Sequence, residues 1–268
     1  MGHDRFSEAA AEYSRRAVVQ QSAAHSLLGA LAISGADDVL DVGCGTGSLT
    51  MLARGMTKGR VAGADPSPAM LAEARRARED VDIEFYHYAA EELPFNAEFD
   101  VAFANSSMQW FTDPPRAFAA IRNALRPGGR FGAQAPATSG YCPQFLRAVG
   151  EAARHADTAA TFATFKNPWF FRESVDEYRW LLEGAGFRVI RAAIEQVATP
   201  MAPEMAMGVF ESGAAAGYLG ASCYPAPLPQ GYAEAFRRIV KESLERQAGP
   251  DGLVTLAFHR LFILARNP

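Results

Sequence analysis

The sequence contains only three cysteines among its 268 residues, Cys44, Cys142 and Cys223, and none of them forms a C-x-x-C pair. An odd number of widely separated cysteines excludes a disulfide-stapled framework and indicates no zinc motif. We therefore expect three buried or half-buried free thiols and no metal site. The sequence also has no run of 18 apolar residues, and its charged start lacks the apolar middle of a signal peptide, so we expect a cytoplasmic protein without a membrane span.

A strong charge of one sign is also missing. Thirty Asp and Glu residues stand against 26 Lys and Arg residues, a net charge of −4, so no positive field would attract nucleic acid or anionic lipid. We expect a small-molecule substrate and a monomer or homodimer. The apolar fraction of 49% is sufficient for a sizeable core, and the length fits one large domain or somewhat more than one average domain.

Short apolar runs alternate with helical stretches along most of the chain. The expected strands are 38–43, 60–65, 81–86, 100–105, 130–135, 187–195 and 253–265. The expected helices are 46–55, 67–79, 114–125 and one that opens with the capping-box sequence at 174–177 and stops at the glycines of 184–186. This alternation predicts βαβ crossovers and an α/β fold with a mostly parallel sheet covered on both faces.

Three segments lie outside this alternation. Residues 1–34 predict a helical cap in front of a core that spans 35–268. The aromatic-rich segment 137–172 and the helical, proline-interrupted segment 197–250 both follow strands. Because ligands bind beyond the carboxyl ends of strands in open α/β sheets, we expect two lid insertions within one domain. The alternative is that both segments are extra helices that pad the sheet.

A glycine loop follows the first expected strand in the string VLDVGCGTG, residues 39–47. Glycines at 43, 45 and 47 remove side chains where the backbone must turn and approach a ligand. Asp65 comes 22 residues after Gly43, at the end of the next strand, where a carboxylate can accept both hydroxyls of a ribose. The third glycine is one position too early for a dinucleotide motif, and the carboxylate of Asp41 suits a cationic ligand better than a pyrophosphate.

Residues 35–135 resemble the class I S-adenosylmethionine-dependent methyltransferases, whose first motif reads much like VLDVGCGTG. The resemblance implies a Rossmann-like, mostly parallel seven-stranded sheet with an antiparallel last strand. It also implies S-adenosyl-L-methionine as the cofactor. The cofactor would be bound by residues of the glycine loop and of the next three strand ends, namely Asp41, Gly43, Cys44, Gly45, Gly47, Asp65, Pro66, Met70, Ala90, Glu91, Asn105 and Ser106.

Two positions in this set carry alternatives. The resemblance places Met70 near the adenine, but a core methionine is equally compatible with the sequence. Many relatives have an Asp that meets the adenine amino group where this chain has Ala89. The adenine would then be held by the backbone at Ala90, by Glu91 or by water.

The pattern Asn105-x-x-x-Gln109-Trp110, followed by Pro-Gly-Gly and Gln-Ala-Pro, resembles the trans-aconitate methyltransferases, and residues 9–28 resemble the malonyl-acyl-carrier-protein methyltransferases. Both groups methylate a carboxylate oxygen, so the resemblance implies an enzyme with a small acid or an acyl carrier protein as its partner. The implied catalytic residues flank the methyl group and are Tyr13, His25 and Gln109. The expected substrate-binding residues are Trp110, Tyr141, Trp169 and Arg172.

Methylation of a carboxylate needs little chemical help from the protein. An acid with a pKa of about 4 is ionised near neutral pH, so attack on the methyl group requires positioning and exclusion of water but no general base. Two other functions stay open at this point. The aromatics at 162–171 favour C- or O-methylation of an apolar natural-product intermediate, and Ala89 is compatible with a regulatory cofactor-binding protein without turnover.

Overall fold

The computed structural model describes residues 25–78 and 80–268, and these form two compact units. The described residues of the first, which we call the sheet unit, are 25–139, 170–195 and 260–268. Those of the second, the helical unit, are 140–169 and 196–259. The helical unit therefore takes up most of the two expected lid segments, whereas Tyr13 lies outside the described residues.

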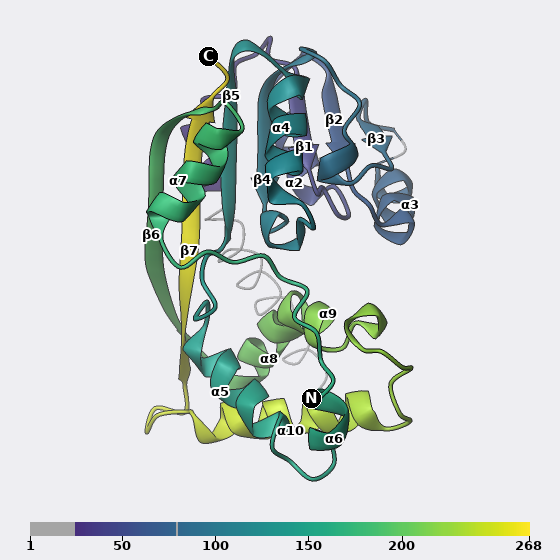
Figure 1. The fold of residues 1–268 in the computed structure, drawn as a ribbon, viewed down its shortest axis with the longest axis vertical. Coiled ribbons are helices and arrows are strands. Elements are labelled where there is room, and N and C mark those ends of the chain that lie inside the picture. The colour runs from purple at the N-terminus through teal and green to yellow at the C-terminus, as the bar shows by residue number, and fades with distance from the viewer. Residues whose placement is uncertain (1–24, 79) are drawn as a thin grey trace, which may run out of the picture. The chain divides into compact units, whose positions relative to one another are not determined.

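A seven-stranded sheet has the strand order β3-β2-β1-β4-β5-β7-β6 (Figure 1). Strands β1 to β5 pair in parallel, and β7 runs antiparallel to β5. This confirms the expected mostly parallel sheet with an antiparallel last strand. The strands are β1 (Val39–Val42), β2 (Val61–Ala64), β3 (Glu84–Tyr86), β4 (Phe99–Asn105), β5 (Leu125–Pro136), β6 (Arg188–Met201) and β7 (Val254–Arg266).

Two strands are longer than the sequence predicts. Strand β5 begins at Leu125, not at residue 130, because Leu125 already pairs with Phe99 and the Pro-Gly-Gly sequence is taken up by a register shift before Val101 pairs with Arg130. Strand β6 continues to Met201, beyond the predicted end at residue 195. In both cases the pairing partner extends the strand past the point where local sequence preference stops.

The helices of the sheet unit begin within two residues of the predicted starts. They are α2 (Ser48–Arg54), α3 (Pro68–Ala77), α4 (Pro114–Ala124) and α7 (Val175–Gly184), with short 3₁₀ helices η1 (Ala90–Glu92) and η2 (Met108–Trp110). The predicted capping box is confirmed, since the Ser174 side chain accepts from the Glu177 N–H and the Glu177 carboxylate accepts from the Ser174 N–H.

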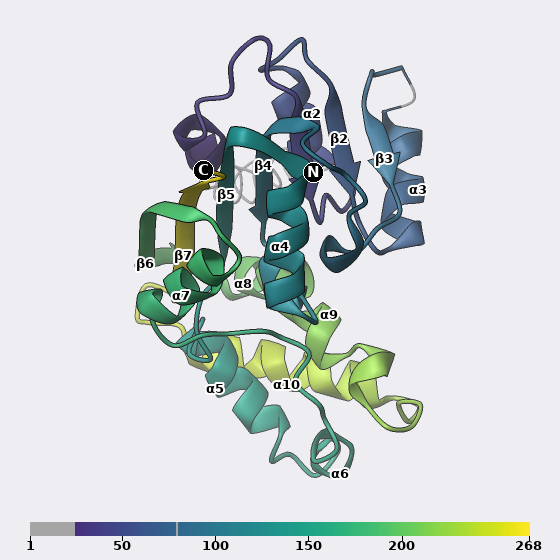
Figure 2. The ribbon, with the colours of Figure 1, turned by 45° about the horizontal axis from the view of Figure 1, so that its top comes forward.

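Alternate residues of the strands pack on opposite faces of the sheet. Helix α4 lies over the face that is turned to the viewer in Figure 2. Leu40 and Ala102 belong to a core cluster that includes α4 and α7. Val39 and Val101 belong to a second cluster on the other face, together with Leu27, Leu28 and Leu31. The described part of the expected N-terminal cap thus contributes to the core of the sheet unit.

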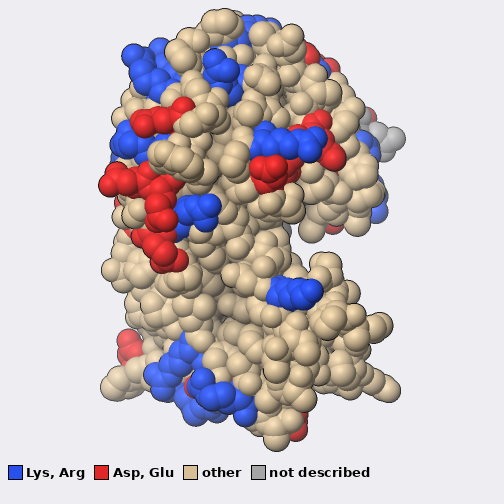
Figure 3. Space-filling view, viewed as in Figure 1, with Lys and Arg blue, Asp and Glu red and all other residues tan. Residues whose placement is uncertain are grey.

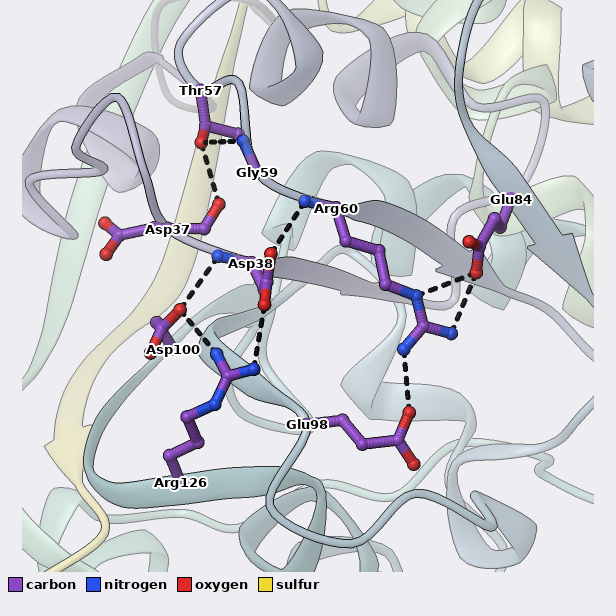
Figure 4. A network of polar contacts seen from close by, with 9 residues as sticks. All are labelled: Asp37, Asp38, Thr57, Gly59, Arg60, Glu84, Glu98, Asp100 and Arg126. Carbon is purple, nitrogen blue, oxygen red and sulfur yellow. Dashed lines mark hydrogen bonds and ion pairs between the residues drawn. The ribbon is translucent and has the colours of Figure 1, made fainter.

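Charged side chains connect the amino ends of β1, β2 and β4 (Figure 4). Arg126 bridges Asp38 and Asp100 at 2.8 and 2.6 Å. The Asp38 N–H donates to Asp100, and the Arg60 N–H donates to Asp38. This network secures one end of the parallel strands and leaves their carboxyl ends for the candidate site.

The helical unit contains α5 (Pro143–Ala152), α6 (Ala159–Phe162), α8 (Pro203–Glu211), α9 (Ala214–Tyr218), η3 (Ala221–Cys223) and α10 (Tyr232–Arg246). Its core is aromatic, with the rings of Phe210 and Phe236 fully buried beside Tyr218. Trp169 packs edge-on against Tyr218 with ring centres 4.8 Å apart. A Cβ at Gly217 would overlap the Trp169 ring, so this packing depends on a glycine.

Surface charge is of mixed sign on the face drawn in Figure 3, where Lys and Arg side chains alternate with groups of Asp and Glu. All three cysteines are free and buried, as expected. Among the described helices, none combines the length and the apolar character needed to cross a bilayer.

Candidate functional site

Three hydrogen bonds attach the glycine loop after β1 to the end of β2, and main-chain N–H groups of the loop are the donors in all three. The N–H groups of Gly43 and Cys44 donate to the Ala64 carbonyl at 2.7 and 3.1 Å. The Gly45 N–H donates to Asp65 Oδ2 at 2.9 Å. All three loop glycines have positive φ angles, +75° at Gly43, +55° at Gly45 and +75° at Gly47, a conformation that other residues adopt only with strain. The sequence prediction that these glycines are needed for a turn is confirmed.

Asp65 caps the loop and also begins the next segment. Its second oxygen, Oδ1, accepts from the Ser67 N–H at 2.8 Å, just before α3. Each carboxylate oxygen has more than one acceptor position, so Asp65 can still accept from a ligand hydroxyl. Pro66 follows at the surface, and Met70 in the first turn of α3 is 46% exposed. The core-methionine alternative for Met70 is therefore wrong, and its thioether is available to a ligand.

Asp41 is buried behind the loop, with 2% of its surface exposed. Its Oδ2 accepts from the Thr50 hydroxyl of α2 at 2.7 Å. Burial, together with the negative charge of Asp65, raises the pKa of Asp41 to about 7 despite the Thr50 hydrogen bond. Two carboxyl groups close enough for the charge of Asp65 to raise the pKa of Asp41 favour a cation, because a positive charge nearby would stabilise the ionised form of Asp41.

Cys44 lies near these two carboxyl groups as a buried thiol. Its Sγ packs against Gly63, where a Cβ would come within 2.9 Å of the sulfur. Burial and the nearby carboxylates raise the pKa of Cys44, so it stays a neutral thiol. Its role is to fill the space beneath the loop.

The turn after β4 meets the glycine loop where the strand order reverses. Strands β1 and β4 are neighbours, but the chain leaves β1 toward β2 and leaves β4 toward β5, the arrangement at which open α/β sheets bind ligands. The Ser107 hydroxyl donates to the Val42 carbonyl at 2.7 Å. A Cβ at Gly43 would overlap Ser107, so loop and turn are in direct contact. Ser107 was not among the predicted site residues. The only feature of the sequence that pointed to it is its place beside Ser106 in a polar turn.

Two side-chain carbonyl oxygens in this turn have no donor among the described residues. They are Oδ1 of Asn105 and Oε1 of Gln109, and both atoms are buried. The Gln109 amide donates from Nε2 to the Ser106 carbonyl at 2.8 Å, which orients the carboxamide. Ser106 has a φ of +54°, a strained conformation for a residue other than glycine. Strain together with unpaired buried acceptors is typical of a ligand site.

The segment after β3 has a structural role in part. Ala90 is buried in η1, and Glu91 uses Oε1 to accept from the N–H groups of Thr112 and Asp113 at 2.7 and 3.1 Å. This carboxylate therefore holds the chain just before α4. With the Thr112 hydroxyl, three donors share Oε1 of Glu91. Glu91 is therefore less suited to bind an adenine.

The expected substrate-side residues fall into both units. In the sheet unit, His25 is exposed and Trp110 is 38% exposed. The Phe170 N–H donates to the Gln109 carbonyl at 2.8 Å, and the Arg172 guanidinium lies 4.7 Å from the centre of the Phe170 ring, so residues 170–172 lie beside the turn.

In the helical unit, Tyr141 is buried and its ring lies 6.3 Å from that of Trp169. Burial raises the pKa of Tyr141, which therefore stays a neutral phenol. The site residues of the sheet unit thus form one connected group, and these two residues form another.

The connected group fits S-adenosylmethionine in chemical terms. Asp65 has acceptor positions that could take ribose hydroxyls, the glycine loop leaves room for close approach of a ligand, and the carboxyls of Asp41 and Asp65 would favour a positive charge. The Asn105 oxygen can accept from an ammonium group.

Comparison with known proteins agrees with this chemistry. Residues 39–129 match the family model described as a methyltransferase domain. A 206-residue alignment, 31% identical, with an uncharacterized methyltransferase of Schizosaccharomyces pombe covers 71% of this chain and 74% of that protein.

Two relatives with named substrates match over shorter stretches. A malonyl-[acyl-carrier protein] O-methyltransferase of Hahella chejuensis is 41% identical over 128 residues, 47% of this chain and 46% of the relative. A trans-aconitate 2-methyltransferase of Deinococcus radiodurans is 40% identical over 109 residues, 40% of this chain and 41% of the relative. The chain thus spans less than half the length of each of these two proteins.

The fold is shared with a crystal structure of an S-adenosylmethionine-dependent methyltransferase from Mesorhizobium loti. The TM-score is 0.54 at 20% identity, with 92% of this chain and 99% of that chain covered. The family model and the long alignment establish that the chain belongs to the methyltransferase family, and the fold of this neighbour agrees with that.

Proposed function

We propose that this protein transfers the methyl group of S-adenosylmethionine to a carboxylate oxygen of a small acid or of an acyl carrier thioester. The observation that carries the proposal is the composition of the turn after β4. Residues 105–110 provide carboxamides, hydroxyls and an indole but no titratable side chain. Such a turn offers no general base, so it suits a nucleophile that is already ionised and has no proton to lose.

The bound cofactor supplies an electrophilic methyl group on a positively charged sulfur. An ionised carboxylate oxygen would form a bond to this methyl carbon as the carbon–sulfur bond breaks, and the electron pair of the carbon–sulfur bond would remain on sulfur. The residues of the protein bind and orient the reactants. The glycine loop and Asp65 hold the cofactor, and the turn at 105–110 borders the reacting atoms.

Electrostatics of the site change during this transfer. The positive charge disappears as the carboxylate is neutralised, so the reaction proceeds best where water does not stabilise the separated charges. Asp41 and Cys44, which lie beneath the glycine loop, are buried and keep water from that side of the loop. The proposal includes a cytoplasmic location, as the sequence analysis expects.

The two named relatives support acids as acceptors, since one name specifies malonyl-acyl-carrier protein and the other trans-aconitate. They do not distinguish a free acid from a carrier-bound acid for this chain. We include the acyl carrier protein as a candidate partner, to be tested beside the free acids.

The test uses S-adenosylmethionine with a radiolabelled methyl group and a panel of free carboxylic acids, acyl carrier thioesters and phenols. We expect label that becomes volatile after base treatment, as a methyl ester does. The Asp65→Ala variant, which should bind the cofactor poorly, serves as the negative control. Label found only in base-stable product would overturn the ester assignment, and absence of transfer to any acceptor would support a non-catalytic cofactor-binding role.

A second candidate, methylation of an apolar intermediate, draws support from the aromatic helical unit. Phe162, Phe165 and Trp169 are each only partly buried there. However, Trp169 is already packed against Tyr218 and Gly217. The phenols in the panel test this candidate directly.

A further inference from the structure

We propose that Gln109 selects the methyl acceptor: its Oε1 accepts a hydrogen bond from an N–H or O–H group that the acceptor carries beside its reacting carboxylate. The inference rests on the proposed function, namely that the acceptor is an acid. It narrows the substrate class from carboxylic acids in general to acids with a neighbouring hydrogen-bond donor.

The orientation of the Gln109 side chain is set by its neighbours. Nε2 donates to the Ser106 carbonyl at 2.8 Å. The reversed amide would place two carbonyl oxygens against each other, so Oε1 must be the free end. The Ser106 N–H is itself bound to the Gln134 carbonyl of β5 at 2.6 Å, and the next residue, Ser107, is bound to Val42. The acceptor atom is therefore held on a rigid support.

The free end is in a costly environment. Gln109 is 7% exposed, and among residues 25–78 and 80–268 no donor reaches Oε1. A buried acceptor without a donor corresponds to a loss of about 5- to 150-fold in an equilibrium constant. A ligand that brings a donor recovers this loss, whereas a ligand that lacks one leaves it in place. This asymmetry makes Gln109 a discriminating contact.

A basic residue on the segment bonded to Gln109 favours the acceptor over the cofactor as the source of the donor. The main chain of Gln109 is bound to Phe170, and the Arg172 guanidinium lies over the Phe170 ring. A fixed positive charge attracts an anionic acid and repels the ammonium and sulfonium of the cofactor. The acid's carboxylate and its donor group are thus both matched by this part of the turn.

The experiment compares pairs of acids that differ only in the donor. The monoamides of malonic, succinic and glutaric acid carry an NH₂ group where the corresponding monomethyl esters carry OCH₃. Initial rates of base-labile methyl transfer are measured for the wild type, Gln109→Met and Asn123→Met. The last variant replaces an exposed amide on α4 and serves as the matched control. Binding of S-adenosylhomocysteine to each variant is measured by calorimetry.

We expect the wild type and Asn123→Met to use the amide of at least one pair with about a tenfold or greater advantage in kcat/KM. In Gln109→Met the kcat/KM values of the amide and the ester should differ by no more than about twofold, mainly because kcat/KM for the amide falls. The affinity of this variant for S-adenosylhomocysteine should stay within about twofold of the wild type. A purely structural role would lower both members of the pair together.

Three results would overturn the inference. Equal kcat/KM values for amide and ester in the wild type would show that the protein does not select for a hydrogen-bond donor on the acceptor. A Gln109→Met variant that loses affinity for S-adenosylhomocysteine would assign the oxygen to the cofactor. A Gln109→Met variant that keeps the amide preference would assign the selection to another residue. Absence of base-labile transfer to every acid would instead refute the proposed function, and this inference with it.

Discussion

The main-chain N–H of Gly45 donates to the carboxylate of Asp65 at 2.9 Å, joining the glycine loop after β1 to the tip of β2. One side chain thus shapes the loop and, in the proposed function, also binds the cofactor. The loop conformation and the affinity for the cofactor are consequently expected to depend on the same residue.

Replacing Asp65 by Ala should weaken cofactor binding. The variant loses the acceptors for the N–H groups of Gly45 and Ser67 as well as those for the ribose. Charge-assisted hydrogen bonds contribute about 1.5–3 kcal/mol, so the dissociation constant for S-adenosylhomocysteine should rise about 10- to 100-fold in calorimetry. Asp80→Ala, at an exposed position, is the control and should bind normally. Equal affinities for wild type and Asp65→Ala would refute this role.

Replacing Gly43 by Ala should damage the site more than replacing Gly45. Both glycines have positive φ angles, which cost another residue roughly 1–2 kcal/mol. Only at Gly43 would the added Cβ also overlap Ser107, because a Cβ at Gly45 would meet open space. Urea unfolding should show the larger loss of stability for Gly43→Ala.

The double variant Gly43→Ala/Ser107→Gly isolates this overlap. It removes the obstructing atoms and should recover part of the stability that Gly43→Ala loses. Identical losses for Gly43→Ala and Gly45→Ala would show that backbone strain, and not the contact with Ser107, accounts for the effect.

Asp41 should make cofactor binding release a proton near neutral pH. Burial raises the pKa of Asp41 to about 7, so about half of the free protein carries a neutral Asp41 at that pH. A bound cation favours the ionised form, so the proton leaves and affinity rises with pH up to the pKa of about 7. Calorimetry in buffers of different ionisation enthalpy measures this release. In Asp41→Asn the release should disappear, and its persistence would assign the proton to another group.

The same residue should affect the stability of the free protein. Because the pKa of Asp41 is higher in the folded than in the unfolded state, its contribution is complete below the unfolded value of about 4 and is lost as pH rises through about 7. Compared with the wild type, Asp41→Asn should therefore lose less stability between pH 5 and 8 in urea unfolding.

Replacing Gly217 by Ala should disturb the helical unit. The new Cβ would overlap the Trp169 ring, and overpacking of this kind costs about 1–3 kcal/mol. The chain has three tryptophans, and Trp169 is the one in the helical unit, so its fluorescence should report the change. Gly184→Ala, where a Cβ meets open space in α7, is the control. Unchanged fluorescence and stability in Gly217→Ala would show that the ring moves aside without cost.

The sheet and the glycine loop could be predicted because their signals are local. Alternating apolar runs, the capping box of Ser174 and Glu177 and the glycines at 43, 45 and 47 each act within a few residues of where they occur. The ends of β5 and β6 could not be predicted in this way. There, pairing with a neighbouring strand extended the strands beyond their local preference.

The uses of single polar residues depended on contacts between distant parts of the chain. Glu91 holds the backbone at Thr112 and Asp113, about 21 residues later. Ser107 reaches back to Val42, 65 residues earlier. Neither partner could be identified from periodicity or spacing, because side-chain hydrogen bonds of this kind follow from tertiary packing.

The hydrogen bond from Ser107 to Val42 has a thermodynamic consequence for the two ligands. It joins the loop that would hold the cofactor to the turn that would hold the acceptor, so an adjustment of one is transmitted to the other. Any increase in acceptor affinity caused by the cofactor must then be matched by an equal increase in cofactor affinity caused by the acceptor. The Ser107 hydroxyl is thus the bond whose removal should make the two binding events more nearly independent.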